Sequence, residues 1–512
     1  MAQPKANTPA PRPRAARAGA GAPAKAPTGI PGFDVLSFGG LPRGRATLVS
    51  GSSGSGKTIF CCQFLLEGVR QWGEHGVFVS FEEPVDDLRR NVRSFGWNLA
   101  ALEKAGQWAF VDAAISFDSA TKVMGEYDLH ALLARIEAAV KAVKARRIVL
   151  DSIGSLFHYF DDPATIRREL YKILQVLKKR GLTVLLTSER LEEYGNVSRF
   201  GVEEYIADNV LILRNVLDNE KRRRTVELLK FRGSPHTTGE QPYVIDPKVG
   251  VHVIPLTRLE MTQKSSQRRV SSGNNALDAM CGGGFFKDSI VLVSGATGTG
   301  KTLMVTEFVK GGYEAGERVL FLAYEESHEQ LLRNAKGWGV DFAKMEKSGK
   351  LRIESAYPET ANLEEHLLHI ERLIDEHKPA RFALDSLSAI ERGSSKKNFR
   401  EFLIALTSFL KKKEVMAIFT STSTNIVGGT SVTDAHISTI TDTIILLRYA
   451  EVYGNIHRVI TVLKMRGSLH TKSIFEFDID GKGMHISGQE FNRASGILGG
   501  MPMLAEKGEG KE

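Results

Sequence analysis

The chain contains two copies of one phosphate-binding motif, and each copy opens the same longer sequence repeat. The first copy is GSSGSGKT at residues 51–58, and the second is GATGTGKT at residues 295–302. Each follows a short apolar run and precedes an apolar-rich stretch, which is the strand–loop–helix context that this motif requires. In such a loop, backbone N–H groups and the lysine surround phosphate oxygens, and the last threonine holds Mg²⁺. Two motifs in matching contexts indicate two nucleotide-binding domains of one kind.

The repeat extends well beyond the two motifs. Residues 79–83 (VSFEE) match 322–326 (LAYEE), 147–152 (RIVLDS) match 381–386 (RFALDS), and 230–236 (KFRGSPH) match 464–470 (KMRGSLH). We therefore expect one domain over residues 27–259 and a second over 276–495, joined by a polar linker at 260–275. Residues 1–26 form a basic tail rich in alanine, proline and glycine that we expect to be disordered. Residues 496–512 form a short C-terminal tail.

Apolar patterning predicts an α/β fold. Buried strands are expected at 75–81, 147–150 and 182–186, and helices at 129–145 and 166–177. This alternation favours a mostly parallel sheet covered by helices. Two runs split by a polar turn end each half, 209–215 with 224–231 and 443–449 with 458–465, and they predict antiparallel hairpins at the sheet edge.

Composition limits where the protein works. Five of the eight net positive charges lie in residues 1–27, so the remainder has only a small excess and shows no strong nucleic-acid signature. The three cysteines, Cys61, Cys62 and Cys281, predict buried thiols rather than disulfides. No apolar stretch approaches the roughly 18 residues that a membrane span requires, and no signal peptide is recognisable. We expect a cytoplasmic protein.

An aspartate ends a buried strand in each half. Asp151 and Asp385 occupy this position, where a carboxylate can hold Mg²⁺ as a Walker-B aspartate does. The alternative is that each caps the following helix. With a P-loop in the same domain, the magnesium role is the favoured interpretation.

A pair of glutamates ends the strand that follows each P-loop helix. The pairs are Glu82–Glu83 and Glu325–Glu326. Phosphoryl transfer needs a carboxylate that orients and deprotonates the attacking oxygen, and neighbouring acids raise each other's pKa. The alternative, solvated loop acids, is disfavoured because the pair recurs.

The Lys-x-Arg-Gly-x-x-His segments lie far from the P-loops in the sequence. Their cations could reach the nucleotide of a neighbouring subunit, as an arginine finger does in trans, which would make a ring the active form. An ordinary basic hairpin end is the alternative.

The halves differ at one informative place. When Asp208 is aligned with Asp442, Glu204–Tyr205 stands opposite Ser438–Thr439. A nucleotide beside this hydroxyl pair could transfer its γ-phosphate to a side chain instead of to water, which adds about −1.5 to −2 charges. We expect Glu325 to take the hydroxyl proton while Lys301 and Mg²⁺ neutralise the phosphate. A plain polar loop is the alternative.

Taken together, these segments resemble the KaiC family of circadian clock ATPases. The resemblance covers about residues 27–495 and depends on FEEP (81–84), VEE (202–204), DNVLILRN (208–215), CGGGFFKD (281–288) and DAHISTITDT (434–443). It implies two tandem RecA-like P-loop NTPase domains, a two-tiered homohexamer and ATP bound between subunits, with ADP as the product.

The resemblance also implies roles for individual residues. Phosphate and Mg²⁺ contacts are expected from Gly54, Ser55, Gly56, Lys57 and Thr58, and from Thr297, Gly298, Thr299, Gly300, Lys301 and Thr302. Further nucleotide contacts are expected from Ser94, Lys230, Phe231, Arg232, Ser234 and His236 in the first half. In the second half, Trp338 is expected near the base, and Arg458, Lys464, Met465, Arg466, Gly467, Ser468, His470 and Lys472 are expected to come from the neighbour. Glu82 and Glu83 would direct water, and the metal set is Thr58, Asp151, Thr302, Glu325 and Asp385. Ser438 and Thr439 match the autophosphorylation pair, with Thr433 as an auxiliary hydroxyl.

The predicted function is that of a hexameric ATPase and serine/threonine autokinase that acts as a clock or timer. The cyanobacterial members carry a long C-terminal tail that recruits KaiA, whereas this chain stops soon after Pro502. We therefore expect a KaiB-type partner without KaiA. Two alternatives are a RecA-like DNA-dependent ATPase or recombinase, for which the basic face is lacking, and a scaffold that binds ATP with little turnover.

Overall fold

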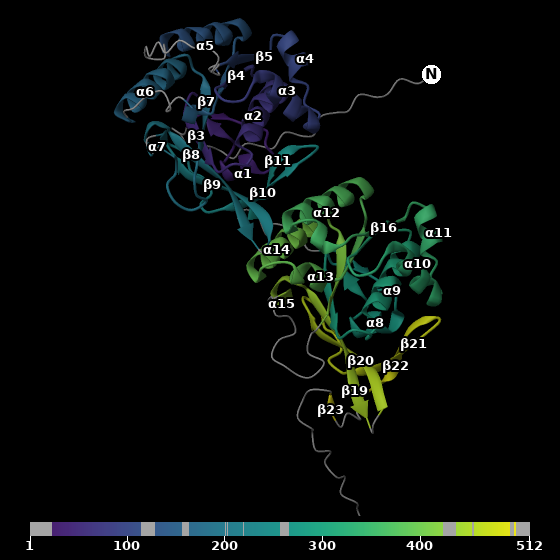
Figure 1. The fold of residues 1–512 in the computed structure, drawn as a ribbon. Helices are drawn as coiled ribbons and strands as arrows, with labels where there is room; N and C mark the ends of the chain where they lie inside the picture. The colour runs from purple at the N-terminus through teal and green to yellow at the C-terminus, as the bar shows by residue number, and fades with distance from the viewer. Residues whose placement is uncertain are drawn as a thin grey trace, which may run out of the picture. The chain divides into compact units, whose positions relative to one another are not determined.

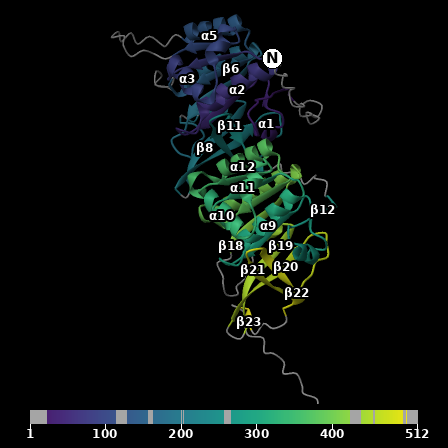
Figure 2. The same cartoon turned by 90° about the vertical axis from the view of Figure 1, so that its right-hand side faces the viewer.

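The computed structural model describes residues 23–113, 129–155, 163–199, 201, 203–218, 220–256, 266–422, 437–452, 455–491 and 496–497. The chain divides into two compact units, residues 1–258 and 259–512. Figure 1 shows both units, the first from purple to teal and the second from green to yellow. Each unit is built around its own sheet with helices on its faces, as the second view in Figure 2 also shows.

The first unit contains a nine-stranded sheet in the order β11-β10-β9-β8-β3-β7-β6-β4-β5. Its parallel part consists of β3 (Ala46–Gly51), β4 (Gly76–Ser80), β5 (Trp108–Asp112), β6 (Arg147–Asp151), β7 (Thr183–Glu189) and β8 (Asn209–Asp218). The strands β3, β4 and β6 are wholly buried and rich in branched apolar residues, as expected for a sheet covered on both faces. The predicted mostly parallel α/β sheet is confirmed.

The predicted hairpin is formed by β8 and β9 (Lys221–Phe231), which pair antiparallel. The sheet then continues through β10 (Gln241–Asp246) and β11 (Gly250–Val253). The hairpin therefore lies inside the sheet rather than at its outer edge. The two added strands are short, and β11 follows a single tight turn, so their apolar runs are too brief to be recognised alone.

Two apolar clusters show that helices cover both faces of the first sheet. Alternate strand residues point to opposite faces: Val49, Phe78 and Val149 belong to one cluster, and their neighbours Leu48, Val77 and Ile148 belong to the other. The first cluster packs under α2 (Lys57–Trp72), α3 (Val85–Val92) and α4 (Leu99–Lys104). The second packs under α5 (Leu129–Val143) and α6 (Pro163–Lys179). The small elements β1 (Lys25–Ala26), α1 (Phe33–Leu36), β2 (Leu41–Pro42) and α7 (Glu203–Ile206) complete the unit.

The second unit repeats this plan. Its main strand path is β16-β15-β17-β18-β14-β19-β20-β21-β22, and the parallel strands are β14 (Ile290–Gly295), β15 (Val319–Ala323), β16 (Leu351–Ser355), β17 (Arg381–Asp385), β18 (Met416–Thr422) and β19 (Thr443–Val452). The antiparallel strands are β20 (Asn455–Met465), β21 (Phe475–Asp480), β22 (Gly483–Glu490) and β23 (Gly496–Ile497). The predicted second hairpin, β19–β20, also lies inside its sheet.

The helices of the second unit are α8 (Asn275–Met280), α9 (Lys301–Glu314), α10 (His328–Gly337), α11 (Phe342–Lys347), α12 (Leu363–His377), α13 (Leu387–Arg392), α14 (Lys396–Lys412) and α15 (Ile437–Ile440). Part of the expected linker packs on this unit: β12 (Arg269–Val270) pairs with β13 (Phe285–Phe286), and Asn274 caps α8. Among the described helices of either unit, none combines the length and apolar character that a membrane crossing needs.

Candidate nucleotide-binding and phosphorylation sites

The first P-loop joins β3 to α2 by a turn that only glycine accommodates. Gly54 and Gly56 have φ of 75° and 84°, and a Cβ on Gly56 would lie 2.7 Å from the Cδ1 of Ile245. Lys57 Nζ donates to the carbonyl oxygens of Gly51 at 2.8 Å and Ser52 at 3.1 Å. Burial lowers the pKa of Lys57 despite nearby acids. The ammonium group thus lies against the loop, next to the place where a phosphate would bind.

The second P-loop has the same geometry. Gly298 and Gly300 have φ of 81° and 103°, and Lys301 Nζ donates to the carbonyl oxygens of Gly295 and Ala296, each at 3.0 Å. In both loops a hydroxyl stabilises the turn: Ser55 Oγ donates to Ser52 O, and Thr299 Oγ1 donates to Ala296 O. A helix N-terminus with inward-facing N–H groups is a ready anion site, so both loops fit the phosphates of a nucleotide.

The strand-end aspartates adjoin the P-loop threonines. Thr302 Oγ1 donates to Asp385 Oδ2 at 2.7 Å, and Thr420 donates to the other carboxylate oxygen. Asp151 likewise accepts from Thr58 and Thr187. Burial raises the pKa of both aspartates, and the hydroxyl donors oppose that shift. A hydroxyl beside a hydrogen-bonded carboxylate suits Mg²⁺, which commonly takes one or two protein oxygens together with phosphate oxygens.

In the first unit, both glutamates after β4 are held by polar neighbours. Ser152 Oγ donates to Glu82 Oε1 at 3.0 Å, and Asn91 Nδ2 donates to Glu83 Oε1 at 2.6 Å. Desolvation by the surrounding protein raises the pKa of each carboxyl group, with further upward effects from nearby acids such as Asp151. A raised pKa suits a proton acceptor that works near neutral pH.

In the second unit, one of the two glutamates has a different partner. Asn334 Nδ2 donates to Glu326 Oε2 at 2.8 Å, repeating the Asn91–Glu83 contact, and burial together with Asp385 raises the pKa of Glu326. Glu325, however, pairs with Arg392 of α13 at 3.1 Å. Ser386, the counterpart of Ser152, is buried and its Oγ has no hydrogen-bond partner among the described residues. The sequence contained no signal for the Glu325–Arg392 pair.

In both units the basic segment bonds to the same short segment, which in the second unit carries the hydroxyl pair. Lys464 Nζ donates to the carbonyl oxygens of Ser438 at 2.6 Å and Thr441 at 2.8 Å, and Arg466 Nη2 donates to Thr439 O at 2.6 Å. In the first unit, Lys230 Nζ donates to the carbonyl oxygens of Glu204 and Ala207, each at 2.9 Å. These matching bonds place Glu204 where the second unit has Ser438, as the alignment on the aspartates predicts.

The hydroxyl pair and the P-loop of one unit lie at opposite ends of its parallel strands. From here on, these two ends are called the two edges of the sheet. The P-loop follows the C-terminal end of β14, whereas α15 precedes the N-terminal end of the parallel strand β19. Thr443 is in register with Val291, and Gly295 is four residues further along β14, which is about 13 Å at 3.3 Å per residue. Lys464 pairs with Ile444 and so lies at the same edge as the hydroxyl pair.

Arg458 lies at the other edge, beside the P-loop of its own unit. It pairs with Tyr449, its guanidinium is 5.9 Å from the Tyr449 ring, and Tyr449 Oη donates to Thr297 O at 3.4 Å. In the first unit, Arg224 Nε donates to Gly54 O at 3.3 Å. Strand β20 runs from one edge to the other, so Arg458 lies near the P-loop of its own chain while Lys464 lies at the opposite edge. That Arg458 reaches a neighbour's nucleotide stays a prediction. Sequence reasoning missed Arg224.

A family model described as the KaiC ATPase matches this chain twice, over residues 26–258 and 270–490. Each match covers one unit. The chain belongs to the KaiC family. It is 59% identical over 485 residues to the circadian clock protein KaiC3 of Synechocystis sp., covering 95% of this chain and 96% of that protein. It is 51% identical to the KaiC proteins of Thermosynechococcus vestitus, over 478 residues, and Synechococcus elongatus, over 479, covering 93% and 94% of this chain and 92% of each relative.

The remaining KaiC-type site residues follow this two-edge arrangement. Those that end or follow β9 and β20 lie at the Lys230 or Lys464 edge: Phe231, Arg232, Ser234 and His236, and Met465, Arg466, Gly467, Ser468, His470 and Lys472. The Phe231 and His236 rings lie 5.7 Å apart, and Arg269 Nη2 donates to Ser468 Oγ. Ser94 Oγ donates to Asn91 O, and Trp338 ends α10 and packs on the core. Thr433 lies outside the described residues.

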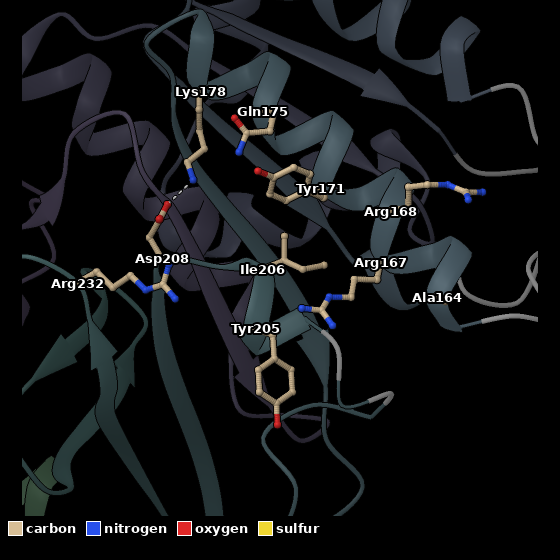
Figure 3. A pocket seen from close by; sticks show the side chains of 10 residues that line it. All are labelled: Ala164, Arg167, Arg168, Tyr171, Gln175, Lys178, Tyr205, Ile206, Asp208 and Arg232. Carbon is tan, nitrogen blue, oxygen red and sulfur yellow. Dashed lines mark ion pairs between the residues drawn. The ribbon is translucent and has the colours of Figure 1, made fainter.

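A cavity of about 470 Å³ opens at the Lys230 edge of the first unit. Figure 3 shows its lining, which includes Arg167, Arg168, Lys178, Arg232, Tyr171 and Tyr205. Lys178 is neutralised by Asp208 at 2.6 Å, and the Arg167 guanidinium lies 6.0 Å from the Tyr205 ring. Arg168 pairs with Glu169 at 3.2 Å. Four basic side chains and one acid, Asp208, line the cavity, so it suits an acidic group. Only Arg232 was identified from the sequence.

Proposed function

We propose that this protein is an ATP-hydrolysing serine/threonine autokinase that works as a homohexamer, with ATP bound between neighbouring copies. The main observation behind this proposal is that the phosphate-binding loop and the hydroxyl pair are far apart within one chain. Within the second unit, Ser438 and the P-loop lie at opposite edges of one sheet, so a hydroxyl can meet a γ-phosphate only where another copy supplies the P-loop. A head-to-tail ring joins these unlike edges at every interface.

At such an interface the second unit would phosphorylate Ser438 and Thr439. Lys301 and the loop N–H groups hold the phosphates, while Thr302 and Asp385 would hold Mg²⁺. Bound Mg²⁺ neutralises charge on the phosphate oxygens. The hydroxyl oxygen forms a bond to the γ-phosphorus, the bond from that phosphorus to the β–γ bridging oxygen breaks, and ADP leaves. The hydroxyl proton passes to Glu325 or Glu326.

The first unit would hydrolyse ATP with the same geometry. Its P-loop residues Lys57 and Thr58, with Asp151, bind the phosphates and metal, and Glu82 and Glu83 direct a water molecule. The residue in the position of Ser438 is Glu204, whose carboxylate accepts from Ser198. The residue in the position of Thr439 is Tyr205, so this segment offers no aliphatic hydroxyl, and we propose water as the acceptor there.

Each nucleotide would be contacted from two copies. The copy that supplies the P-loop would also supply Ser94 in the first unit and Trp338 in the second. The neighbour would supply the groups of the opposite edge: Lys230, Phe231, Arg232, Ser234 and His236, or Lys464, Met465, Arg466, Gly467, Ser468, His470 and Lys472. The basic cavity around Arg232 lies at this edge, and its charge complements a nucleotide and the acids beside it.

The biological role proposed here is a phosphorylation-based clock or timer in the cytoplasm. It is supported by the clock proteins to which this chain is similar over nearly its whole length. We propose a KaiB-like partner. Membership of the KaiC family removes the basis for the RecA-like recombinase alternative, since no observation favours it.

The test is complementation between two defective variants that carry different size tags. One variant, Glu325→Gln with Glu326→Gln, lacks the proton acceptors, and the other, Ser438→Ala with Thr439→Ala, lacks the phosphate acceptors. Neither should incorporate label from γ-labelled ATP alone. After subunit exchange, label should appear on the glutamine variant only. Absence of label in the mixture, when wild-type chains of both tags exchange and are labelled, would contradict transfer between copies.

A further inference from the structure

A buried tyrosine–histidine pair stands directly behind the acids of the second unit. Tyr324 is the residue before Glu325, and His366 lies in α12. Tyr324 Oη and His366 Nδ1 are 3.2 Å apart, and the two rings meet edge to face with centroids 5.3 Å apart. The side chains are only 4% and 5% exposed. Two polar groups buried this deeply need defined partners.

The surrounding bonds fix the tautomer of His366. Its Nε2 lies 3.0 Å from Pro358 O in the short helix η4 (Pro358–Thr360). Because a carbonyl oxygen only accepts, Nε2 carries the hydrogen, and in the neutral ring Nδ1 accepts from the Tyr324 hydroxyl. A neutral imidazole therefore satisfies both contacts, and the Tyr324 ring is held by a directional bond from a separate helix.

The backbone of Tyr324 is tied to the metal-site aspartate. Tyr324 N donates to Asp385 O at 2.7 Å, beyond the last register pair of β15 and β17. Tyr324 thus joins the ends of the two strands from which Glu325, Glu326 and Asp385 emerge. Any rotation of its backbone would move both glutamates relative to Asp385.

The first unit has an apolar pair at the same place. Phe81 precedes Glu82, and its N–H donates to Asp151 O at 2.8 Å. Leu132 of α5 stands where α12 has His366, counting from the start of each helix. Both side chains are buried in one apolar cluster. Apolar packing is non-directional, so Phe81 lacks the hydrogen bond that ties the Tyr324 ring to a separate helix.

We propose that Tyr324 and His366 are a positioning pair that holds Glu325 and Glu326 for transfer to an alcohol. A water molecule is free to adjust to a carboxylate, whereas the hydroxyl of Ser438 or Thr439 is tethered to a neighbouring copy. The acid that serves it must therefore be held to within about 0.5 Å, because a displacement of about 1 Å can reduce the rate roughly 100-fold. This inference depends on the autokinase function proposed above.

The test compares Tyr324→Phe, His366→Leu and the double variant, which copies the first-unit pair, in a background where Glu82→Gln and Glu83→Gln silence the first unit. We expect the double variant to lower phosphate incorporation at Ser438 and Thr439 by about tenfold. The KM for ATP should change less than about twofold, because neither side chain touches the phosphate loop. The ratio of released phosphate to incorporated phosphate should rise, since water does not need the fixed acid.

His377→Leu is the matched control. His377 lies on the same helix, and its Nε2 contacts Val319 O at 3.1 Å, at the far end of the same strand β15. It should leave incorporation within about twofold of the background. Tyr324→Phe removes one oxygen and tests the pair should His366→Leu fail to fold.

The outcomes separate the two proposals. No incorporation by the background protein would refute the autokinase function itself. If the background protein incorporates phosphate normally, two results would refute the positioning role alone. One is that neither Tyr324→Phe nor the double variant lowers incorporation, and the other is that incorporation falls while the ratio of released to incorporated phosphate stays unchanged.

Discussion

Lys464 Nζ lies 2.6 Å from the carbonyl oxygen of Ser438 and 2.8 Å from that of Thr441. One ammonium group therefore satisfies two carbonyls around the short helix α15, which is too short to be stable alone. The same lysine is proposed to contact the neighbouring copy's nucleotide. Burial and the nearby Arg466 lower the pKa of Lys464.

Lys464→Met should loosen the hydroxyl-bearing segment. The substitution removes the ammonium group that donates to the carbonyl oxygens of Ser438 and Thr441. Each hydrogen bond from a charged donor contributes about 1.5–3 kcal/mol. Amide hydrogens of residues 437–442 should exchange faster by roughly tenfold or more. Lys482→Met, in the turn between β21 and β22, is the control and should leave this exchange unchanged. Equal exchange in both variants would show that Lys464 does not stabilise α15.

Thr420→Val should raise the Mg²⁺ concentration needed for half-maximal phosphorylation by about tenfold. The substitution keeps the shape of the side chain but removes the hydroxyl that donates to Asp385, and loss of such an orienting partner typically weakens metal binding 10–100-fold. A Mg²⁺ titration of the labelling rate measures the effect. Thr407→Val is the matched control, since in the described part of the chain this buried hydroxyl donates within its own helix, to Leu403 O and Ile404 O. An unshifted titration for Thr420→Val would argue against Asp385 as the metal ligand.

Asn334→Ala should move the acid limb of the phosphorylation rate to higher pH. The Asn334 amide stabilises the charged form of Glu326, so its removal raises further a pKa that burial already holds above the ordinary value. A proton acceptor works only when ionised, so the rate falls as pH drops through that pKa, and a higher pKa brings the fall sooner. Asn91→Ala should shift the hydrolysis profile of the first unit in the same direction through Glu83. Superimposable profiles would exclude these glutamates as the titrating groups.

Arg147→Leu should destabilise the first unit by about 3–5 kcal/mol. This fully buried guanidinium bonds Glu74 at 2.7 Å and the carbonyl oxygens of Phe64 and Pro27, each at 2.8 Å. Burial favours neutral Glu74, yet Arg147 and Arg43 hold its pKa below the ordinary value. The stabilisation is therefore present above the unfolded pKa of Glu74 and is lost as the pH falls through the folded one. Denaturant unfolding measures the change.

The surface pair Arg70–Glu67 provides the control for that experiment. Its atoms are 3.5 Å apart and the arginine side chain is 46% exposed, so Arg70→Leu should change the unfolding free energy by less than about 1 kcal/mol. A similar loss in both variants would mean that burial of Arg147 is irrelevant to its contribution.

The parts of the site that follow the chain locally were predictable. The P-loops, Asp151, Asp385 and the glutamate pairs each end a strand or begin a helix, and their chemistry is set by that position. The buried strands were recognisable because a parallel sheet demands continuous apolar runs. The hairpins were found as well, but their place inside the sheet was not, since β10 and β21 carry no apolar signal beyond a few residues.

Contacts between distant segments could not be predicted. Arg392 meets Glu325 across 67 residues, and His366 meets Tyr324 across 42. Nothing in either local pattern distinguishes these side chains from ordinary surface or core residues. The places of Arg224 and Arg458 could not be predicted for a related reason: a long strand runs from one end of its neighbours to the other, so residues close in the sequence lie at opposite edges.

The two-edge layout gives a closed ring a sense of direction. On the proposed mechanism, each copy receives a phosphate from the ATP of the copy on one side. The γ-phosphate of its own ATP goes to the copy on the other side. Phosphorylation of Ser438 would thus report the nucleotide bound by a neighbouring copy rather than the chain's own. Dilution to single chains would stop phosphate transfer while each chain remained folded.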